Sequence, residues 1–300
     1  MEQQRRPGMD VVEIGVSDPE RSLAFYRDVL GFPTVAAPAP SRPGTTWVWA
    51  GSVHVALVPA DAAAGPDLRG WEGDDLQRGM RHLGFKVGDV RAYAEHLRTA
   101  GVTFTLEPLR AVGDVDLAFF TDPDGTLLEI IDGHLTYHET FSGELAAQEA
   151  AAAAARRPDA GPALDHLAIT VADLDATLAF YRDKLGYELI GSLDHSYDER
   201  GFLIHYLQAG PSILEVFTFT RAQTRPSPWT APDPGRLGLR GVAHGVDDLD
   251  VALTRLRVAG ASPVPQDPAA APALDVPHAH LFDPDGVPLQ VWSVGDEVGR

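Results

Sequence analysis

Short apolar strands followed by amphipathic helices recur along the chain. Residues 167–171 are mainly apolar and end in Thr170 and Val171, a pattern that predicts a short strand. Asp173 or Asp175 can cap a helix after it, and apolar residues then recur near the helical period until Gly186. The pattern therefore predicts a strand, a turn and a helix in succession.

The same succession occurs four times. VVEIGVSDPERSLAFYRDVLGFPTV (11–35) aligns without a gap with HLAITVADLDATLAFYRDKLGYELI (166–190). HLGFKVGDVRAYAEHLRTAGV (82–102) aligns likewise with GVAHGVDDLDVALTRLRVAGA (241–261). Internal repeats of this kind indicate a fold built from copies of one unit. Short strands follow each helix, which predicts four βαβββ units, modules 1 to 4, at 9–60, 80–133, 164–218 and 239–294.

Modules 2 and 4 share a strong turn signal, DPDG, at 122–125 and 283–286. Proline is pre-set for the second position of such a turn, and glycine accepts a positive φ. The alanine-rich segment 141–163 predicts a linker that is helical to about Arg157. We therefore expect an α+β fold with two domains, 1–140 (modules 9–60 and 80–133) and 164–300 (modules 164–218 and 239–294).

Charge and composition narrow the class of partner. The formal net charge of −19 argues against nucleic acid or an anionic membrane, because phosphate binding requires clustered Lys and Arg. The chain has no cysteine, which excludes thiolate ligands and thiol nucleophiles. No segment is typical of a signal peptide or a membrane span. We expect a cytoplasmic protein, a monomer or homodimer, that acts on a small molecule.

Paired modules with LAFYRDKLGY, DPDG and a carboxylate in an apolar last strand resemble the vicinal oxygen chelate superfamily. This superfamily includes glyoxalase I, extradiol dioxygenases and bleomycin-binding proteins. The resemblance implies that each module can offer one side chain from its first strand and one from its last strand. Two facing modules would then close a cup around one divalent ion.

The positions that match this motif carry different residues in different modules. Modules 2 and 3 have good ligands at all of them: His82, Glu129, His166 and Glu215. Modules 1 and 4 have Val11, Ala56, Gly241 and Gln290, of which Gln290 is at best a weak ligand. Glu129 and Glu215 lie inside apolar runs, where an unpaired carboxylate is costly to bury. We therefore expect one complete metal site shared between modules 2 and 3.

Other polar residues have less specific interpretations. Glu13 lies on the strand face of Val11 and is an alternative ligand beside His82 and Glu129. Three residues of module 3 are candidates for substrate contacts or proton transfer: His195, Tyr197 and His205. Three further histidines could form a second site but are more typical of pocket-lining residues: His54, His278 and His280.

One histidine and three tryptophans are expected to be structural. His244 is conspicuous in RGVAHGVDDLD, yet it is three residues from Gly241 and so faces the opposite side of a strand. A β-bulge would reverse this parity and make His244 a ligand. The tryptophans are expected in the core or in a pocket wall: Trp47, Trp49 and Trp71.

The resemblance and the ligand set favour glyoxalase I-like chemistry, by isomerisation, epimerisation or elimination. One divalent ion (Ni, Co, Mn, Fe or Zn) would bind vicinal oxygens of a small substrate, with Glu129 or Glu215 as general base. An extradiol dioxygenase is an alternative, but it requires two His and one Glu from one domain. A non-catalytic binding or resistance protein is the third possibility.

Overall fold

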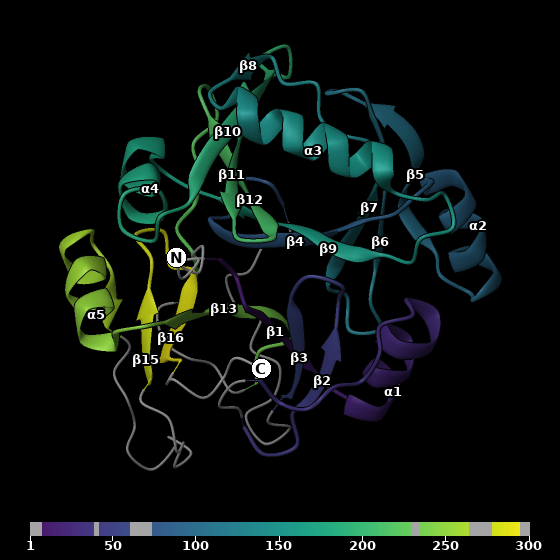
Figure 1. Ribbon diagram of the computed structural model, residues 1–300, viewed down its shortest axis with the longest axis horizontal. Helices are drawn as coiled ribbons and strands as arrows, with labels where there is room; N and C mark the ends of the chain where they lie inside the picture. Colours follow the sequence, from purple (N-terminus) through teal and green to yellow (C-terminus); the bar gives the residue numbers. More distant parts are fainter. Residues whose placement is uncertain (1–7, 39–41, 61–73, 230–234, 264–277, 295–300) are drawn as a thin grey trace.

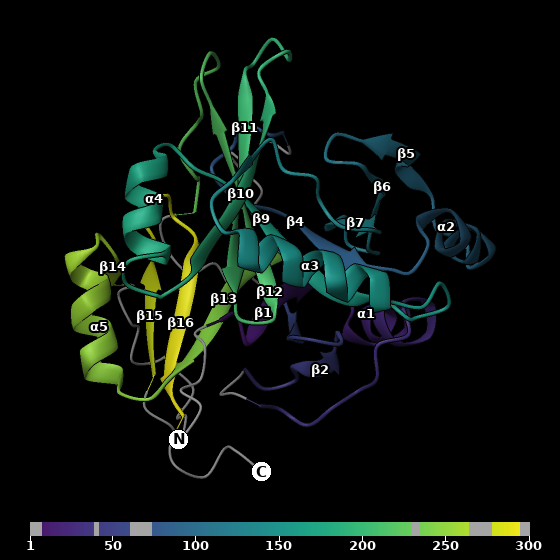
Figure 2. The ribbon, with the colours of Figure 1, turned by 45° about the horizontal axis from the view of Figure 1, so that its top comes forward.

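The computed structural model describes residues 8–38, 42–60, 74–229, 235–263 and 278–294. Two mixed sheets occupy the two halves of the molecule, with α4 (Leu174–Tyr181) and α5 (Leu249–Val258) on one side. Helices α1 (Pro19–Ala24) and α2 (Val90–Thr99) lie on the opposite side, and both views show this arrangement (Figures 1 and 2). The expected α+β fold is confirmed.

The seven-stranded sheet, called the small sheet below, combines modules 1 and 4. Its order is β14-β15-β16-β13-β1-β3-β2. Module 1 supplies β1 (Val11–Val16), β2 (Thr46–Trp49) and β3 (His54–Pro59). Module 4 supplies β13 (Gly238–Val246), β14 (Ser262–Pro263), β15 (His278–Phe282) and β16 (Pro288–Ser293). The antiparallel pair of β1 and β13 joins the two modules.

The nine-stranded sheet, called the large sheet below, combines modules 2 and 3 and ends at β8 (Glu139–Thr140). Its order is β5-β6-β7-β4-β9-β12-β11-β10-β8. Module 2 supplies β4 (Gly79–Lys86), β5 (Phe104–Ala111), β6 (Val115–Thr121) and β7 (Leu127–Ile131). Module 3 supplies β9 (Ala163–Thr170), β10 (Glu188–His195), β11 (Phe202–Ala209) and β12 (Ser212–Phe219).

Each sheet therefore contains strands from both sides of the linker, and the antiparallel pair of β4 and β9 joins modules 2 and 3. The ranges 1–140 and 164–300 each contribute one module to each sheet. We propose these two ranges as the two copies of the long repeat in the sequence.

An aspartate caps the helix of every module. The side chains of Asp18, Asp89, Asp173 and Asp248 each accept a backbone N–H of the first helical turn. Asp173, rather than Asp175, is thus the cap of α4. In module 1 the helix continues as the π-helical η1 (Phe25–Val29). These caps fix where each helix leaves its first strand and so where each sheet can form.

Module 1 departs from the predicted βαβββ order. After its helix the described residues form only β2 and β3, and the expected strand between η1 and β2 is reduced to one bridge between Thr34 and Val48. This segment carries Pro33, Pro38 and Pro43. Proline has no N–H to donate to a sheet ladder, which explains why a regular strand does not form.

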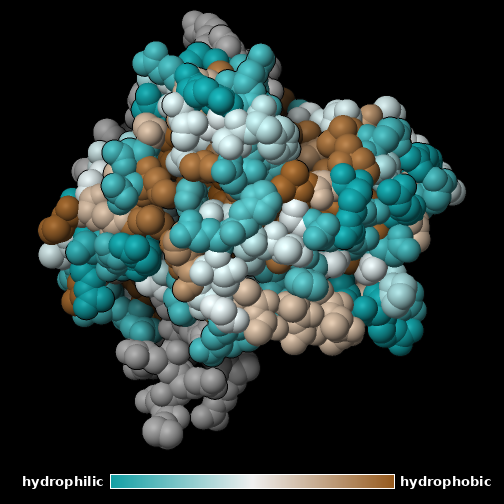
Figure 3. Space-filling model, turned by 90° about the horizontal axis from the view of Figure 1, so that it is seen from above, coloured by the Kyte–Doolittle hydropathy of each residue, from teal (hydrophilic) through white to brown (hydrophobic). Residues whose placement is uncertain are grey.

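The linker helix α3 (Gly143–Ala155) packs on the large sheet near β10 (Figure 2). Ser142 caps it, and Leu145 is buried with side chains of β11 and β12. Glu149 accepts the N–H of Leu135 at 3.0 Å and the hydroxyl of Tyr137 at 2.6 Å. The predicted linker helix thus also covers part of one sheet face. Seen from this side, the surface is mostly hydrophilic, with hydrophobic residues in small separate groups (Figure 3).

The described residues form three apolar clusters in the interior. The largest combines the module helices with one face of each sheet, and includes Leu83, Leu167 and Val216. A second lies on the other face of the large sheet, and a third, around Trp47 and Trp292, lies on the other face of the small sheet. Most strands are therefore buried on both faces, as the apolar runs around Glu129 and Glu215 require. Each described helix is too short or too polar to cross a bilayer.

Candidate metal centre

Four side chains converge on one face of the large sheet. They come from four neighbouring strands: Glu129 from β7, His82 from β4, His166 from β9 and Glu215 from β12. The register brings them level, because Gly84 pairs with both Glu129 and His166, and Ala168 pairs with both His82 and Glu215. Because side chains alternate between the two faces of a strand, the apolar residues next to these four point to the other face and belong to the largest core cluster. We call these four residues the His–Glu cluster.

The donor atoms of the His–Glu cluster have the separations expected of ligands around one ion. His82 Nε2 is 3.0 Å from Glu129 Oε2 and 3.4 Å from Glu215 Oε2. His166 Nε2 is 3.3 Å and 3.6 Å from the same two oxygens, and 3.2 Å from His82 Nε2. Ligands about 2.0–2.2 Å from an ion lie roughly 3.0–3.5 Å apart at octahedral or tetrahedral angles. The cluster can therefore hold one divalent ion.

The charge of the buried cluster favours a cation. The four residues are between 2% and 7% exposed. Burial raises the pKa of Glu129, but His166 and His82 outweigh this effect and hold the pKa at about 2. Burial lowers the pKa of His166, while Glu215, Glu129 and Asp165 together raise it well above its ordinary value. Glu129 thus stays ionised and attracts positive charge.

His166 is oriented by a second hydrogen bond. Its Nδ1 is 3.0 Å from Asp165 Oδ2, and Asp165 Oδ1 lies 3.4 Å from Lys86 Nζ. Burial raises the pKa of Asp165, but Lys86 and His166 lower it to about 2. An ionised Asp165 holds the proton on Nδ1, which leaves Nε2 free for the cluster. His82 Nδ1, by contrast, has no hydrogen-bond partner in the described part of the chain.

Gly84 makes room for the imidazole of His166. A Cβ atom at Gly84 would lie 2.0 Å from His166 Cε1 and 2.2 Å from Nε2. The two residues face each other across the pair of β4 and β9. Any side chain at position 84 would therefore displace the ligand ring.

Sequence analysis missed Tyr206, which lies opposite Glu215 across β11 and β12. Its side chain hydrogen-bonds to Glu215, and burial together with that carboxylate raises its pKa well above 10. The two-residue turn at Gly210–Pro211 fixes this pairing, because Ala209 is opposite Ser212. That turn in the sequence could have identified Tyr206.

Sequence analysis also missed Arg81. Burial lowers the pKa of its guanidinium, while the carboxylates of Asp75, Glu215 and Glu129 raise it. The guanidinium is therefore close enough to the His–Glu cluster to interact with both of its carboxylates. No pattern in the sequence indicates the β-bulge that places it there.

The substrate-contact candidates of module 3 have different positions. His195 shares the face of the cluster and stacks on Phe202, with ring centroids 4.3 Å apart. Tyr197 is 75% exposed, and its hydroxyl is 3.2 Å from His195 Nδ1. His205 pairs with Val216, so it lies on the opposite face from Glu215, and the expected contact with the site does not form.

The corresponding positions of modules 1 and 4 follow the same register without the ligands. In the small sheet Val11 pairs with Ala243, which matches the pair of His82 and Ala168 in the large sheet. Glu13 likewise pairs with Gly241, which matches the pair of Gly84 and His166. Ala56 is buried, and Gln290 pairs with His280. Glu13 lies in the small sheet and is not part of the His–Glu cluster, so the alternative that it joins His82 and Glu129 is wrong.

The remaining histidines and tryptophans do not assemble a second centre among the described residues. His278 and His280 are neighbours on β15, with ring centroids 5.4 Å apart, while His54 packs on Trp49 at 4.7 Å. Trp47 is buried in the third apolar cluster. Trp71 lies outside the described residues.

His244 lies on the face opposite to the ligand positions, as its register predicts. It pairs with Val291 of the largest core cluster. Its Nδ1 is 2.8 Å from the carbonyl oxygen of Gly8 and 3.4 Å from the hydroxyl of Tyr187. His244 therefore ties the start of the described chain to the core.

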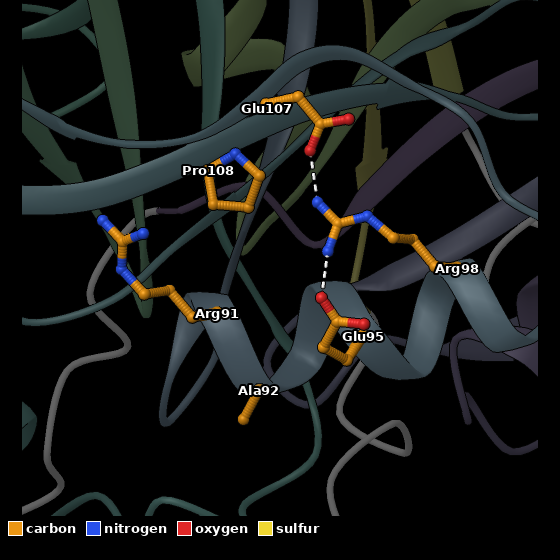
Figure 4. Close-up of a pocket in the computed structure, with 6 residues that line it drawn as sticks. All are labelled: Arg91, Ala92, Glu95, Arg98, Glu107 and Pro108. Atoms are coloured by element: carbon orange, nitrogen blue, oxygen red, sulfur yellow. Dashed lines mark hydrogen bonds and ion pairs between the residues drawn. The ribbon is translucent and has the colours of Figure 1, made fainter.

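A surface hollow between α2 and β5 is separate from the cluster (Figure 4). Arg98 bridges Glu95 and Glu107 there, and Arg91, Ala92 and Pro108 complete the lining. Arg98 and the two glutamates are paired with each other at the surface, which is typical of a solvated ion-pair network.

Known proteins share this architecture. The family model of the Glyoxalase/Bleomycin resistance protein/Dioxygenase superfamily matches residues 8–130 and 163–291. A probable chloroplastic lactoylglutathione lyase of Arabidopsis thaliana is 24% identical over 280 residues, which cover 90% of this chain and 68% of that protein. Glyoxalase I of Saccharomyces cerevisiae is 26% identical over 229 residues, covering 73% of this chain and 65%, about two thirds, of the relative.

A solved structure shows the same fold. The crystal structure of glyoxalase I from Zea mays superposes with a TM-score of 0.65 at 21% identity, covering 95% of this chain and 92% of that one.

Proposed function

Because the chain belongs to the glyoxalase/bleomycin resistance protein/dioxygenase superfamily, we propose that it is a metal-dependent enzyme of the glyoxalase I type. Its one active centre would be the His–Glu cluster, shared between modules 2 and 3, and its reaction an isomerisation, epimerisation or elimination on a small oxygenated substrate. The observation that carries the proposal is the approach of four buried donor atoms to within 4.8 Å of one another.

Two imidazoles and two carboxylates suit a first-row dication such as Ni, Co, Mn, Fe or Zn. When bound, such an ion would supply a Lewis acid for vicinal oxygens of the substrate. His82, His166 and Glu129 would hold it, since Glu129 Oε2 makes the shorter contacts to both histidines. Asp165 would keep His166 in the orientation that binding requires.

Glu215 is the better candidate for the general base. Its contacts to the two histidines, 3.4 Å and 3.6 Å, are the longer ones, and its Oε2 has no hydrogen-bond partner among the described residues. It is also the most exposed of the four, at 7%. Glu215 would take a proton from the carbon next to the substrate carbonyl, and Tyr206 would position its carboxylate.

Metal analysis and a proton-transfer assay test the proposal together. We expect about one divalent ion per chain, lost in His82→Ala and His166→Ala and retained in the exposed control His134→Ala. Glu215→Gln should retain the ion but slow proton exchange at least about 100-fold, the usual effect of losing a general base. The name of the Arabidopsis thaliana relative, a probable lactoylglutathione lyase, makes lactoylglutathione the first compound to assay.

Other results of these experiments would favour one of the two alternative functions, a non-catalytic binding protein or a dioxygenase. A purified protein without any divalent ion would favour a non-catalytic binder. Iron together with oxygen-dependent cleavage of a catechol ring would favour a dioxygenase, in which two histidines and one carboxylate suffice. Full exchange activity in Glu215→Gln would move the role of base to Glu129.

A further inference from the structure

A β-bulge in β4 turns Arg81 toward the face of the His–Glu cluster. Met80 pairs with Ile169, but His82 pairs with the very next residue, Ala168, so Arg81 is the extra residue of the strand. The guanidinium carbon lies 3.6 Å from the centroid of the Phe217 ring. Phe217 follows Glu215 by two positions on β12 and shares its face, so Arg81 lies beside the cluster.

The guanidinium is held firmly, yet one of its nitrogens has no partner. Arg81 Nη2 donates to Asp75, which also accepts from Arg200 Nη1 at 2.5 Å. The carbonyl oxygen of Asp75 in turn accepts the hydroxyl of Thr170 at 2.8 Å. Arg81 Nη1 is buried and makes no hydrogen bond to any described residue. A buried donor without an acceptor is costly and calls for an acceptor that the described residues do not supply.

The chemistry of that acceptor follows from the donor. A guanidinium presents N–H groups in a fixed plane that matches a carboxylate or a similar planar oxyanion. Stacking on Phe217 holds this plane in one orientation. The nearby protein carboxylates, Glu129 and Glu215, face the two histidines, and neither accepts a hydrogen bond from Arg81 Nη1. The free donor is thus available to an oxygen of the substrate.

Farther from the cluster, aromatic side chains lie on the same face of the large sheet. Phe202 pairs with Phe219 across β11 and β12, and both are partly exposed. His195 stacks on Phe202 and extends this surface toward β10. Such a surface suits an apolar or aromatic substrate body, as bound small molecules are held mainly by apolar contacts with a few polar anchors.

We propose that Arg81 binds a carboxylate of the substrate beside the oxygens that the cluster would hold through its ion, and that the substrate is an apolar or aromatic 2-oxo or 2-hydroxy acid. This inference rests on the proposed function. Arg81 Nη1 donates to the carboxylate, and the aromatic surface around Phe202 receives the apolar body.

Binding of phenylglyoxylate and of its neutral methyl ester to the cobalt-loaded protein tests the inference. Absorption of the cobalt ion and titration calorimetry report binding without turnover. The full-length wild type should bind the acid more tightly than the ester. In Arg81→Met, which keeps the apolar stem, the acid should bind about 10- to 100-fold more weakly, the value of one charged hydrogen bond, and the ester as before. Arg81→Lys, which keeps the charge, should restore part of the loss.

Arg98→Met is the matched control, because Arg98 pairs with glutamates in the surface hollow of Figure 4. It should change neither affinity, and all variants should retain one cobalt ion. Unchanged acid binding in Arg81→Met with full cobalt content would overturn the inference alone. Loss of cobalt in Arg81→Met would also overturn it, by making Arg81 a support of the centre. A wild type that takes up no cobalt would overturn the proposed function and the inference with it.

Discussion

At the scale of single residues, Gly84 lies so close to the ring of His166 that no side chain larger than a hydrogen atom fits at position 84. Gly84→Ala would place a methyl group within 2.5 Å of three ring atoms of His166. Because backbone pairing on both sides holds β4 in place, the ring must move rather than the strand. We expect divalent-ion affinity to fall at least about tenfold, as when a ligand loses its orientation. Metal titration of the purified variant measures this.

Gly143→Ala is the control for that substitution, since a Cβ there meets nothing within 4 Å. Position 143 begins α3, so alanine should leave stability unchanged or raise it slightly. Equal metal affinity in Gly84→Ala and wild type would show that His166 is not held by this contact.

At the scale of elements, the first aspartate of each DPDG turn accepts a hydrogen bond from a tyrosine in the helix of the preceding module, a contact called a clasp below. Tyr26 of η1 donates to Asp122 at 3.0 Å, and Tyr181 of α4 donates to Asp283 at 2.9 Å. Each aspartate also accepts backbone N–H groups of its own turn. The clasps join module 1 to module 2 and module 3 to module 4, which are the pairs that the sheets do not join.

The clasp at Asp283 makes stability depend on pH. Burial raises the pKa of Asp283 to about 7, against the lowering effect of its hydrogen bond from Val287. The ordinary pKa, which applies to the unfolded chain, is about 3.9. The protonated carboxyl therefore favours the folded state, and this contribution is complete below pH of about 4 and lost as pH rises through about 7.

Asp283→Asn should remove this contribution. We expect the loss of unfolding free energy between pH 5 and pH 8 to be smaller in the variant than in the wild type. Urea denaturation at several pH values measures it, with the exposed Asp159→Asn as control. Identical pH profiles for Asp283→Asn and wild type would contradict a titrating Asp283.

At the scale of the whole molecule, the His–Glu cluster connects the two sides of the linker. His82 and Glu129 precede α3, whereas His166 and Glu215 follow it. An ion held by His82, Glu129 and His166 would join modules 2 and 3 in the folded state only. At 100 times its Kd, it should raise the free energy of unfolding by about 2.7 kcal/mol.

Calorimetric melting with and without a chelator checks this stabilisation. His82→Ala should melt at the same temperature under both conditions, whereas His134→Ala should behave as the wild type. A metal-dependent shift of equal size in His82→Ala would place the bound ion elsewhere.

The sequence by itself determined the modules and the ligand types. Local signals suffice for these: the Asp caps, the DPDG turns and the apolar runs around Glu129 and Glu215 depend only on nearby residues. The alternation of side chains along a strand predicted that His244 lies on the opposite face from Gly241, which is confirmed. The face of His205 relative to Glu215 was not predicted in this way, because it depends on how β11 pairs with β12.

The ligand positions in the sequence predicted that modules 2 and 3 share a site, but only the tertiary structure decided which strands pair there and where Arg81 points. The pairing of β4 with β9 joins residues on opposite sides of the linker, and nothing within either strand specifies its partner. The bulge at Arg81 exists only in that pairing, since it is a mismatch between two strands and not a property of one. Likewise, α3 covers the face of the large sheet because Leu145 and Glu149 find partners on it. Contacts between distant segments form this centre, and a local pattern cannot encode them.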